Sequence, residues 1–285
     1  MKIIENFALA SCFSFDLDFS IIIRNSLGQT EFKEDKKRDE YKDFGEAVFD
    51  ISIYDDGELV FKKEALLTIP CHGFCELYSS EIGFEFNYSK EYLIIVTGHK
   101  EREDESTMAR EYGIKYFNKN NREKVCSLLY DAFAYNPDQK LFSPINLINH
   151  KCWTSSDVEC AVYFLALNPL MEQKTVNEEP IIISILSESG QLLHKQQDKI
   201  YYNSVYKFDL KKHLKGKVDF GKELKFFNVI ASGYNARYPI FTVLKNNLSG
   251  NLAIEHSLPP YYYFPKAKDF FQIRENFIKN LKAIN

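Results

Sequence analysis

Residue types that commonly bind ligands are concentrated in a short stretch near the C-terminal end of the sequence. Glu255 and His256 supply a carboxylate and an imidazole, and three consecutive tyrosines follow a few positions later. A tyrosine ring combines an apolar face with a polar tip, which suits sugar rings, peptides and protein surfaces. We therefore predict an aromatic binding surface that contains Glu255, His256, Tyr261, Tyr262 and Tyr263. The alternative is that the prolines at 259 and 260 end the last strand and that the tyrosines cover a sheet edge.

A second segment carries complementary groups. The loop at residues 233–239 contains Arg237, which can donate hydrogen bonds, and Tyr238, which can stack on a ligand. In a sandwich of two β-sheets this loop could lie near the tyrosine segment, so we include Arg237 and Tyr238 in the predicted site. The predicted partner is a carbohydrate, a peptide or a protein.

A zinc site is a chemical alternative that we considered. Two groups of thiols and imidazoles could together form the tetrahedral ligand set that zinc prefers. They are Cys71, His72 and Cys75, and His150, Cys152 and Cys160. On a strand, however, alternation directs Cys71 and Cys75 to one face and His72 to the other. Free cysteine also behaves as a small apolar core residue. We therefore predict neither a metal nor another cofactor.

Motifs of the common enzyme superfamilies are absent from the sequence. It contains no Gly-rich phosphate loop, no Gly-x-Gly-x-x-Gly, no Gly-x-Ser-x-Gly and no His-Glu-x-x-His, and its six histidines include no His-x-His pair. A non-catalytic binding or scaffold protein is therefore the favoured interpretation. The alternative is an enzyme, metal-dependent or not, with a site between two modules that uses His150, Glu255 and His256.

Composition argues against several classes of partner. The formal net charge of −4 gives no long-range attraction for nucleic acid, and no apolar run approaches the ~20 residues of a transmembrane helix. A secretory signal is not predicted, because Glu5 and Asn6 interrupt the apolar N-terminal stretch. Six cysteines are few for 285 residues, which favours reduced thiols. We expect a cytoplasmic protein that binds neither nucleic acid nor membranes.

An internal repeat organises the chain. Residues 52–60 and 184–193 both read as an apolar strand, an acidic turn that contains Gly, and a second strand, which is the pattern of a β-hairpin. Three further blocks match in the same order: 19–25 with 162–168, 74–77 with 207–210, and 92–98 with 227–233. Their shifts are 143, 133 and 135 positions. Two β-rich modules of one architecture are therefore predicted.

Short strands with polar turns, without alternation of strands and helices, indicate an all-β and mainly antiparallel protein. We predict two tandem β-sandwich modules, of jelly-roll or immunoglobulin-like topology, at residues 1–100 and 141–260. The connector at residues 101–140 carries a short helix over 123–135, where Val125, Leu128 and Leu129 follow helical spacing. Residues 261–285 hold the Tyr/Pro segment and an amphipathic helix from about Asp269, through which the chain could form a homo-oligomer.

Overall fold

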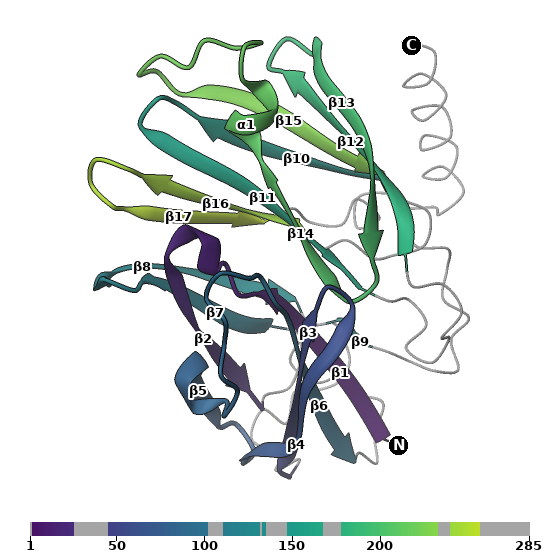
Figure 1. Ribbon diagram of the computed structural model, residues 1–285. Coiled ribbons are helices and arrows are strands. Elements are labelled where there is room, and N and C mark those ends of the chain that lie inside the picture. Colours follow the sequence, from purple (N-terminus) through teal and green to yellow (C-terminus); the bar gives the residue numbers. More distant parts are fainter. Residues whose placement is uncertain are drawn as a thin grey trace, which may run out of the picture. The chain divides into compact units, whose positions relative to one another are not determined.

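The computed structural model describes residues 2–25, 45–101, 111–131, 133–134, 147–167, 178–232 and 240–256. These residues form antiparallel sheets and one short α-helix, so the predicted all-β class is confirmed (Figure 1). Contacts divide the chain at residue 140 into two compact units, apart from residues 203–205 and 245–254, which group with the first unit. We define two modules by their sheets: the first contains strands β1–β9 and the second contains strands β10–β17.

The first module contains two sheets. The larger sheet has the strand order β4-β3-β6-β1-β9, and the smaller sheet has the order β5-β2-β7-β8. The strands are β1 (Lys2–Ala10), β2 (Leu17–Arg24), β3 (Ala47–Asp55), β4 (Glu58–Ile69), β5 (Phe74–Tyr78), β6 (Leu93–Glu101), β7 (Glu111–Asn118), β8 (Asn121–Asp131) and β9 (Phe133–Ala134). Two 3₁₀ turns, η1 (Phe13–Phe15) and η2 (Ser79–Glu81), follow β1 and β5.

The second module also contains two sheets, with the orders β10-β15-β12-β13 and β14-β11-β16-β17. The strands are β10 (Leu147–Thr154), β11 (Val158–Ala166), β12 (Glu178–Ser187), β13 (Leu192–Tyr201), β14 (Ser204–Asp209), β15 (Lys225–Ser232), β16 (Ile240–Asn246) and β17 (Leu252–His256). The α-helix α1 (Leu210–Leu214) follows β14, and the Asp209 side chain caps it by accepting the Lys212 N–H at 3.1 Å.

The two modules share one topology. When β1–β8 are placed in order on β10–β17, the orders β4-β3-β6-β1 and β5-β2-β7-β8 become the orders observed in the second module. The register agrees as well. Ser52 lies opposite Ile95 in the first module. Ser184 lies opposite Ile230 in the second, as the predicted shifts of these blocks require. The predicted repeat is therefore confirmed.

One predicted block is displaced by two residues. β5 ends at Tyr78 and runs directly into η2, and β14 ends at Asp209 and runs directly into α1. This junction aligns position 78 with position 209, a shift of 131 rather than 133. The buried residue just before the junction is then Leu77 in one module and Phe208 in the other. Because a slip of two residues keeps a side chain on the same face, the sequence pattern alone could not detect it.

The helix predicted over residues 123–135 is wrong. The chain forms strand β8 there, and β8 pairs antiparallel with β7, with Val125 opposite Phe117 and Cys126 opposite Tyr116. A short apolar run is compatible with both the helical and the strand period. Pairing with the neighbouring strand β7 selects the strand. The predicted C-terminal helix lies outside the described residues. Within the described ranges, no helix is long and apolar enough to cross a membrane.

Strand alternation builds the core of each module. In the first module, Phe49, Ile51 and Ile53 of β3 are buried, whereas the residues between them are partly exposed. In the second, Ile181, Ile183 and Ile185 of β12 belong to one apolar cluster. The predicted hairpins are also present: Asp56 and Gly57 form the two-residue turn between β3 and β4, both with positive φ.

Candidate functional site

A cavity of about 530 Å³ opens on the second module, and we call it the Phe226 cavity. Its walls are the β12–β13 turn at residues 187–189, the start of β15 with the residue before it (224–227), and the side chains of Leu193 and Val218. The turn is closed by hydrogen bonds from the Ser187 N–H to the Gln191 carbonyl (2.8 Å) and from the Gly190 N–H to the Ser187 carbonyl (2.9 Å). The predicted hairpin therefore forms one wall of the cavity.

Apolar side chains line the mouth of this cavity. Phe226 is 48% exposed and Leu224 is 50% exposed, although both are large and apolar. Phe226 lies directly opposite Trp153 on β10, with ring centroids 6.3 Å apart. Phe227, the next residue, is buried in the core and holds this part of β15 in place. The result is an aromatic surface on a rigid strand, with one face open to solvent.

Charged groups flank the apolar surface. Glu188 and Lys225 line the cavity and are exposed. Among the described residues, neither side chain has a hydrogen-bond or ion-pair partner. The hydroxyls of Ser187 and Ser189 lie 2.9 Å apart in the turn. The cavity therefore presents a carboxylate, an ammonium group and two hydroxyls around an apolar ring face.

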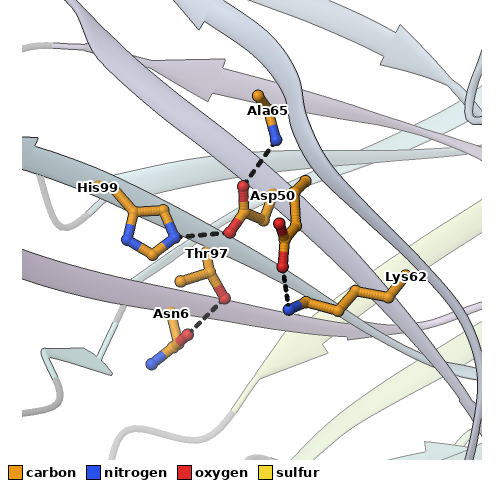
Figure 2. A network of polar contacts seen from close by, with 7 residues as sticks. Asn6, Asp50, Lys62, Ala65, Thr97 and His99 are labelled. Atoms are coloured by element: carbon orange, nitrogen blue, oxygen red, sulfur yellow. Dashed lines mark hydrogen bonds and ion pairs between the residues drawn. The ribbon is translucent and has the colours of Figure 1, made fainter.

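A polar network lies on the first module (Figure 2). Asp50 accepts hydrogen bonds from the Ala65 N–H at 2.8 Å and from His99 Nε2 at 2.7 Å. Thr97 donates to Asn6 Oδ1 at 2.7 Å. Asp50, Thr97 and Asn6 are directly opposite one another on β3, β6 and β1, so they share one face of the larger sheet.

Two nitrogens of this network have no hydrogen-bond partner among the described residues. Because Nε2 of His99 must carry the proton that it donates to Asp50, its Nδ1 is a hydrogen-bond acceptor in the neutral ring. Within the described part of the chain, neither this Nδ1 nor Nδ2 of the buried Asn6 has a hydrogen-bond partner. The network can therefore accept and donate one further hydrogen bond, and Asp50 holds the imidazole in place.

The fold does not require this network. The corresponding positions in the second module are Ile182, Ser232 and Leu147, which are opposite one another in the same way. Asp50 instead stabilises a bulge in β4, where Ala65 has a φ of 49° and the register shifts between Phe49 and Ile51. The sequence signal was an acidic residue at an outward position of a strand whose inward positions are apolar, and the sequence analysis did not use it.

The residues predicted from the tyrosine-rich stretch are only partly described. Arg237, Tyr238, Tyr261, Tyr262 and Tyr263 lie outside the described residues. Glu255 and His256 end strand β17, where Glu255 is exposed and His256 is partly buried. Alternation places these two side chains on opposite faces of the strand.

The histidines form two pairs that the sequence analysis did not predict. In the core of the second module, His150 Nε2 is hydrogen-bonded to Thr242 Oγ1, and the pKa of His150 is lowered to about 4, mainly by burial and also by nearby His256. The rings of His194 and His213 lie 5.2 Å apart in the same module. Burial lowers the pKa of His213. Each pair joins two different elements, β10 with β17 and β13 with α1, and spacing in the sequence does not reveal such contacts.

The zinc alternative has no support in the described residues. No group of three or more His, Cys, Asp or Glu side chains there could hold a metal ion. Cys71 and Cys75 belong to the first module, whereas Cys152 and Cys160 are buried in the core of the second.

Comparison with known proteins does not place the chain in a family. No protein-family model matches the chain. No curated protein matches it either. Among solved structures, a β-glucuronidase of Bacteroides uniformis is 8% identical with a TM-score of 0.21, and the match covers 90% of this chain and 26% of that chain. A glycosyl hydrolase family 2 member from Bacteroides cellulosilyticus is 9% identical with a TM-score of 0.19, over 88% of this chain and 27% of that chain.

A lectin from Pleurotus ostreatus, solved in complex with GalNAc, is 8% identical with a TM-score of 0.21, and the match covers 90% of this chain and 76% of the lectin. The chain thus spans about a quarter of the length of the two hydrolases, at 26% and 27%. Similarity at these TM-scores carries no functional argument.

Proposed function

We propose that the protein is a non-catalytic carbohydrate-binding protein and that the Phe226 cavity holds the sugar. The proposal rests on the mouth of the cavity, where the apolar side chains of Phe226 and Leu224 are half exposed. The charged groups of Glu188 and Lys225, which have no partner among the described residues, lie beside them. The proposal keeps the predicted mode of binding, an aromatic surface on the second module, but uses different residues.

The chemistry of the cavity matches that of a sugar. The C–H face of a pyranose ring is apolar and can pack on the face of Phe226, while its hydroxyls can bond to a carboxylate, an ammonium group or a serine hydroxyl. The cavity volume of about 530 Å³ also lies within the range of roughly 300–1,000 Å³ that small-molecule sites occupy. A monosaccharide or a disaccharide fits this volume.

A peptide fits the site less well. Extended peptides are held mainly by main-chain hydrogen bonds at a strand edge. The Phe226 cavity instead lies between the β12–β13 turn and β15, which is an interior strand of its sheet. The observed groups therefore favour a ligand that is bound through its ring face and its hydroxyls.

Other parts of the sequence-based interpretation remain predictions. They are the contribution of Arg237, Tyr238, Glu255, His256 and the tyrosines at 261–263 to ligand binding, the cytoplasmic location, and homo-oligomer formation through the C-terminal helix. None of them is needed for the Phe226 cavity to bind a sugar.

Trp153 allows a direct test, because it is the only tryptophan in the chain and packs beside Phe226. We would titrate the full chain with neutral hexoses, N-acetylated hexosamines and their disaccharides while recording tryptophan emission. A saturable change with one class of sugar is the expected result. If no sugar alters the emission and calorimetry detects no heat of binding, the proposal is wrong, whereas a response to peptides alone would assign the cavity to a protein partner.

A further inference from the structure

Two thiols lie in the core of the second module. Cys152 lies on β10 and Cys160 on β11, and residues 155–157 form the tight connection between these strands. Both cysteines belong to the same apolar cluster, with exposed fractions of 0% and 2%. The Thr154 hydroxyl donates a hydrogen bond to the Val158 carbonyl at 2.5 Å, which holds the two strands together two residues after Cys152 and two residues before Cys160. The two thiols thus lie at equal distances along the chain from this contact, inside one core.

The surroundings of the pair keep the thiol of Cys160 protonated. Cys152 Sγ donates a weak hydrogen bond to the Phe227 carbonyl, with an S···O distance of 3.8 Å. The contact with Cys152, together with burial, raises the pKa of Cys160 well above its usual range. Because the thiolate is the reactive form of cysteine, the folded module slows the oxidation of Cys160.

The first module has no such pair, although it has the same topology. When β1 is aligned with β10 and β2 with β11, Ser11 corresponds to Cys152 and Leu17 corresponds to Cys160. Ser11 donates to the Glu91 carboxylate at 2.8 Å, and Leu17 is buried. The sandwich core therefore does not require two thiols at these positions, and the pair is a property of the second module alone.

We propose that Cys152 and Cys160 are an oxidisable dithiol that forms a disulfide between the two sheets of the second module. The oxidant is a small-molecule disulfide. The thiolate of one cysteine attacks a sulfur of the oxidant, which forms a mixed disulfide and releases one small thiol. The second cysteine, also deprotonated, attacks the protein sulfur of the mixed disulfide, the intramolecular S–S bond forms, and the second small thiol leaves. The protein loses two electrons and two protons, and the oxidant is reduced to two thiols.

The bond would connect strands that belong to two different sheets. β10 belongs to the sheet with β15, and β11 belongs to the sheet with β14 and β16. A covalent link between them restricts the unfolded chain and so stabilises the module. Because both sulfurs are buried, exchange requires opening of the module, so oxidation is slow in the native protein and rapid during refolding.

The test is oxidation of the full chain. The reduced protein is unfolded, refolded with an excess of oxidised glutathione, alkylated under denaturing conditions and mapped by mass spectrometry without reduction. The expected product is a monomer in which the other four cysteines are alkylated and Cys152 and Cys160 are joined by a disulfide. Its melting temperature should exceed that of the reduced protein by several degrees.

Variants provide the controls. Cys152→Ala and Cys160→Ala should lose the cross-link and the gain in melting temperature, whereas Cys126→Ala, which changes a cysteine of the first module, should keep both. If Cys152 and Cys160 are both recovered alkylated after oxidation, or if either is linked to a different cysteine, the proposal is wrong. If an alanine variant fails to fold, the disulfide map of the unsubstituted protein still shows whether Cys152 and Cys160 are linked.

Discussion

His150 occupies the position in the second module that Leu9 occupies in the first. Leu9 lies opposite Ile94 on β6, and His150 lies opposite Val229 on β15. Those partners are themselves equivalent, because their strands align at a constant shift of 135 positions. Both side chains are buried. One core position thus carries an apolar side chain in one module and a titratable one in the other.

This relationship predicts that acid weakens the second module. Burial, and then His256, lower the pKa of His150 to about 4, below the ordinary value of 6.5 that it regains on unfolding. Between these values the unfolded chain binds more protons than the folded chain, so the free energy of unfolding rises with pH. The contribution of neutral His150 to the free energy of unfolding is complete above about pH 6.5 and is lost as the pH falls towards 4. The difference between the folded and unfolded pKa values corresponds to about 3 kcal/mol.

The His150→Leu variant should remove this pH dependence, since leucine cannot be protonated and the first module accepts it at this position. Thr242 loses its hydrogen-bond partner, so the substitution is best combined with Thr242→Val. Urea denaturation at pH 7, 6 and 5 measures the effect. His72→Asn is the matched control, because His72 is exposed with a φ of 60° that Asn tolerates. If the variant and the unsubstituted protein lose stability in parallel as the pH falls, His150 is not the group responsible.

A second prediction concerns the Phe226 cavity. Removing the ring with Phe226→Ala should weaken sugar binding about tenfold, the equivalent of a stacking contribution of roughly 1–1.5 kcal/mol. Stability should change by about 1 kcal/mol or less, since Phe226 is half exposed. Glu188→Gln should also weaken binding, because a neutral amide accepts weaker hydrogen bonds from sugar hydroxyls than a carboxylate. Isothermal titration calorimetry with the sugar that responds best measures both variants.

Phe74→Ala is the control for this experiment. Phe74 is the more exposed side chain, at 74%, but it lies on β5 of the first module. Its removal should leave the affinity for the sugar unchanged. Equal losses of affinity in Phe74→Ala and Phe226→Ala would mean that the sugar binds wherever apolar surface is exposed and that the cavity has no specific role.

The fold could be predicted from local features of the sequence. The candidate sites could not, because they depend on which distant strands pair. The Asp56-Gly57 turn and the alternation in β3 are local, so the hairpin and its repeat could be predicted. The exposure of Phe226 depends on which face of β15 is turned outward, and the sequence shows only two successive phenylalanines. The polar network required Asn6 and Thr97 to meet across strands that are far apart in the sequence.

A third prediction concerns the polar network of the first module. Asp50→Ala removes the acceptor of two hydrogen bonds, from the Ala65 N–H and from His99. Hydrogen bonds to a charged group contribute about 1.5–3 kcal/mol each, and the part-exposed site lies at the low end, so we expect the loss of both to cost about 3 kcal/mol. Asp55→Ala, which removes an ion pair with the exposed Lys90, should cost about 1 kcal/mol or less.

A double-mutant cycle separates the two hydrogen bonds of Asp50. If His99 acts through Asp50, the losses in Asp50→Ala and His99→Ala should not add, and the coupling should be about 0.5–1 kcal/mol. Additive losses measured by denaturation would show that the imidazole contributes independently and that Asp50 mainly holds the bulge.

The bulge itself gives the last prediction. Ala65 has a φ of 49°, a left-handed conformation that costs an L-residue with a Cβ about 1–2 kcal/mol. Ala65→Gly relieves this cost and adds about 0.5–1 kcal/mol of unfolded-chain entropy, so stability should stay constant or rise by up to about 1 kcal/mol. Ala253→Gly, at an exposed position of β17 without a positive φ, should lower stability instead. Thermal denaturation of the two variants side by side measures the difference, and a clear loss in Ala65→Gly would mean that the bulge is not strained at this residue.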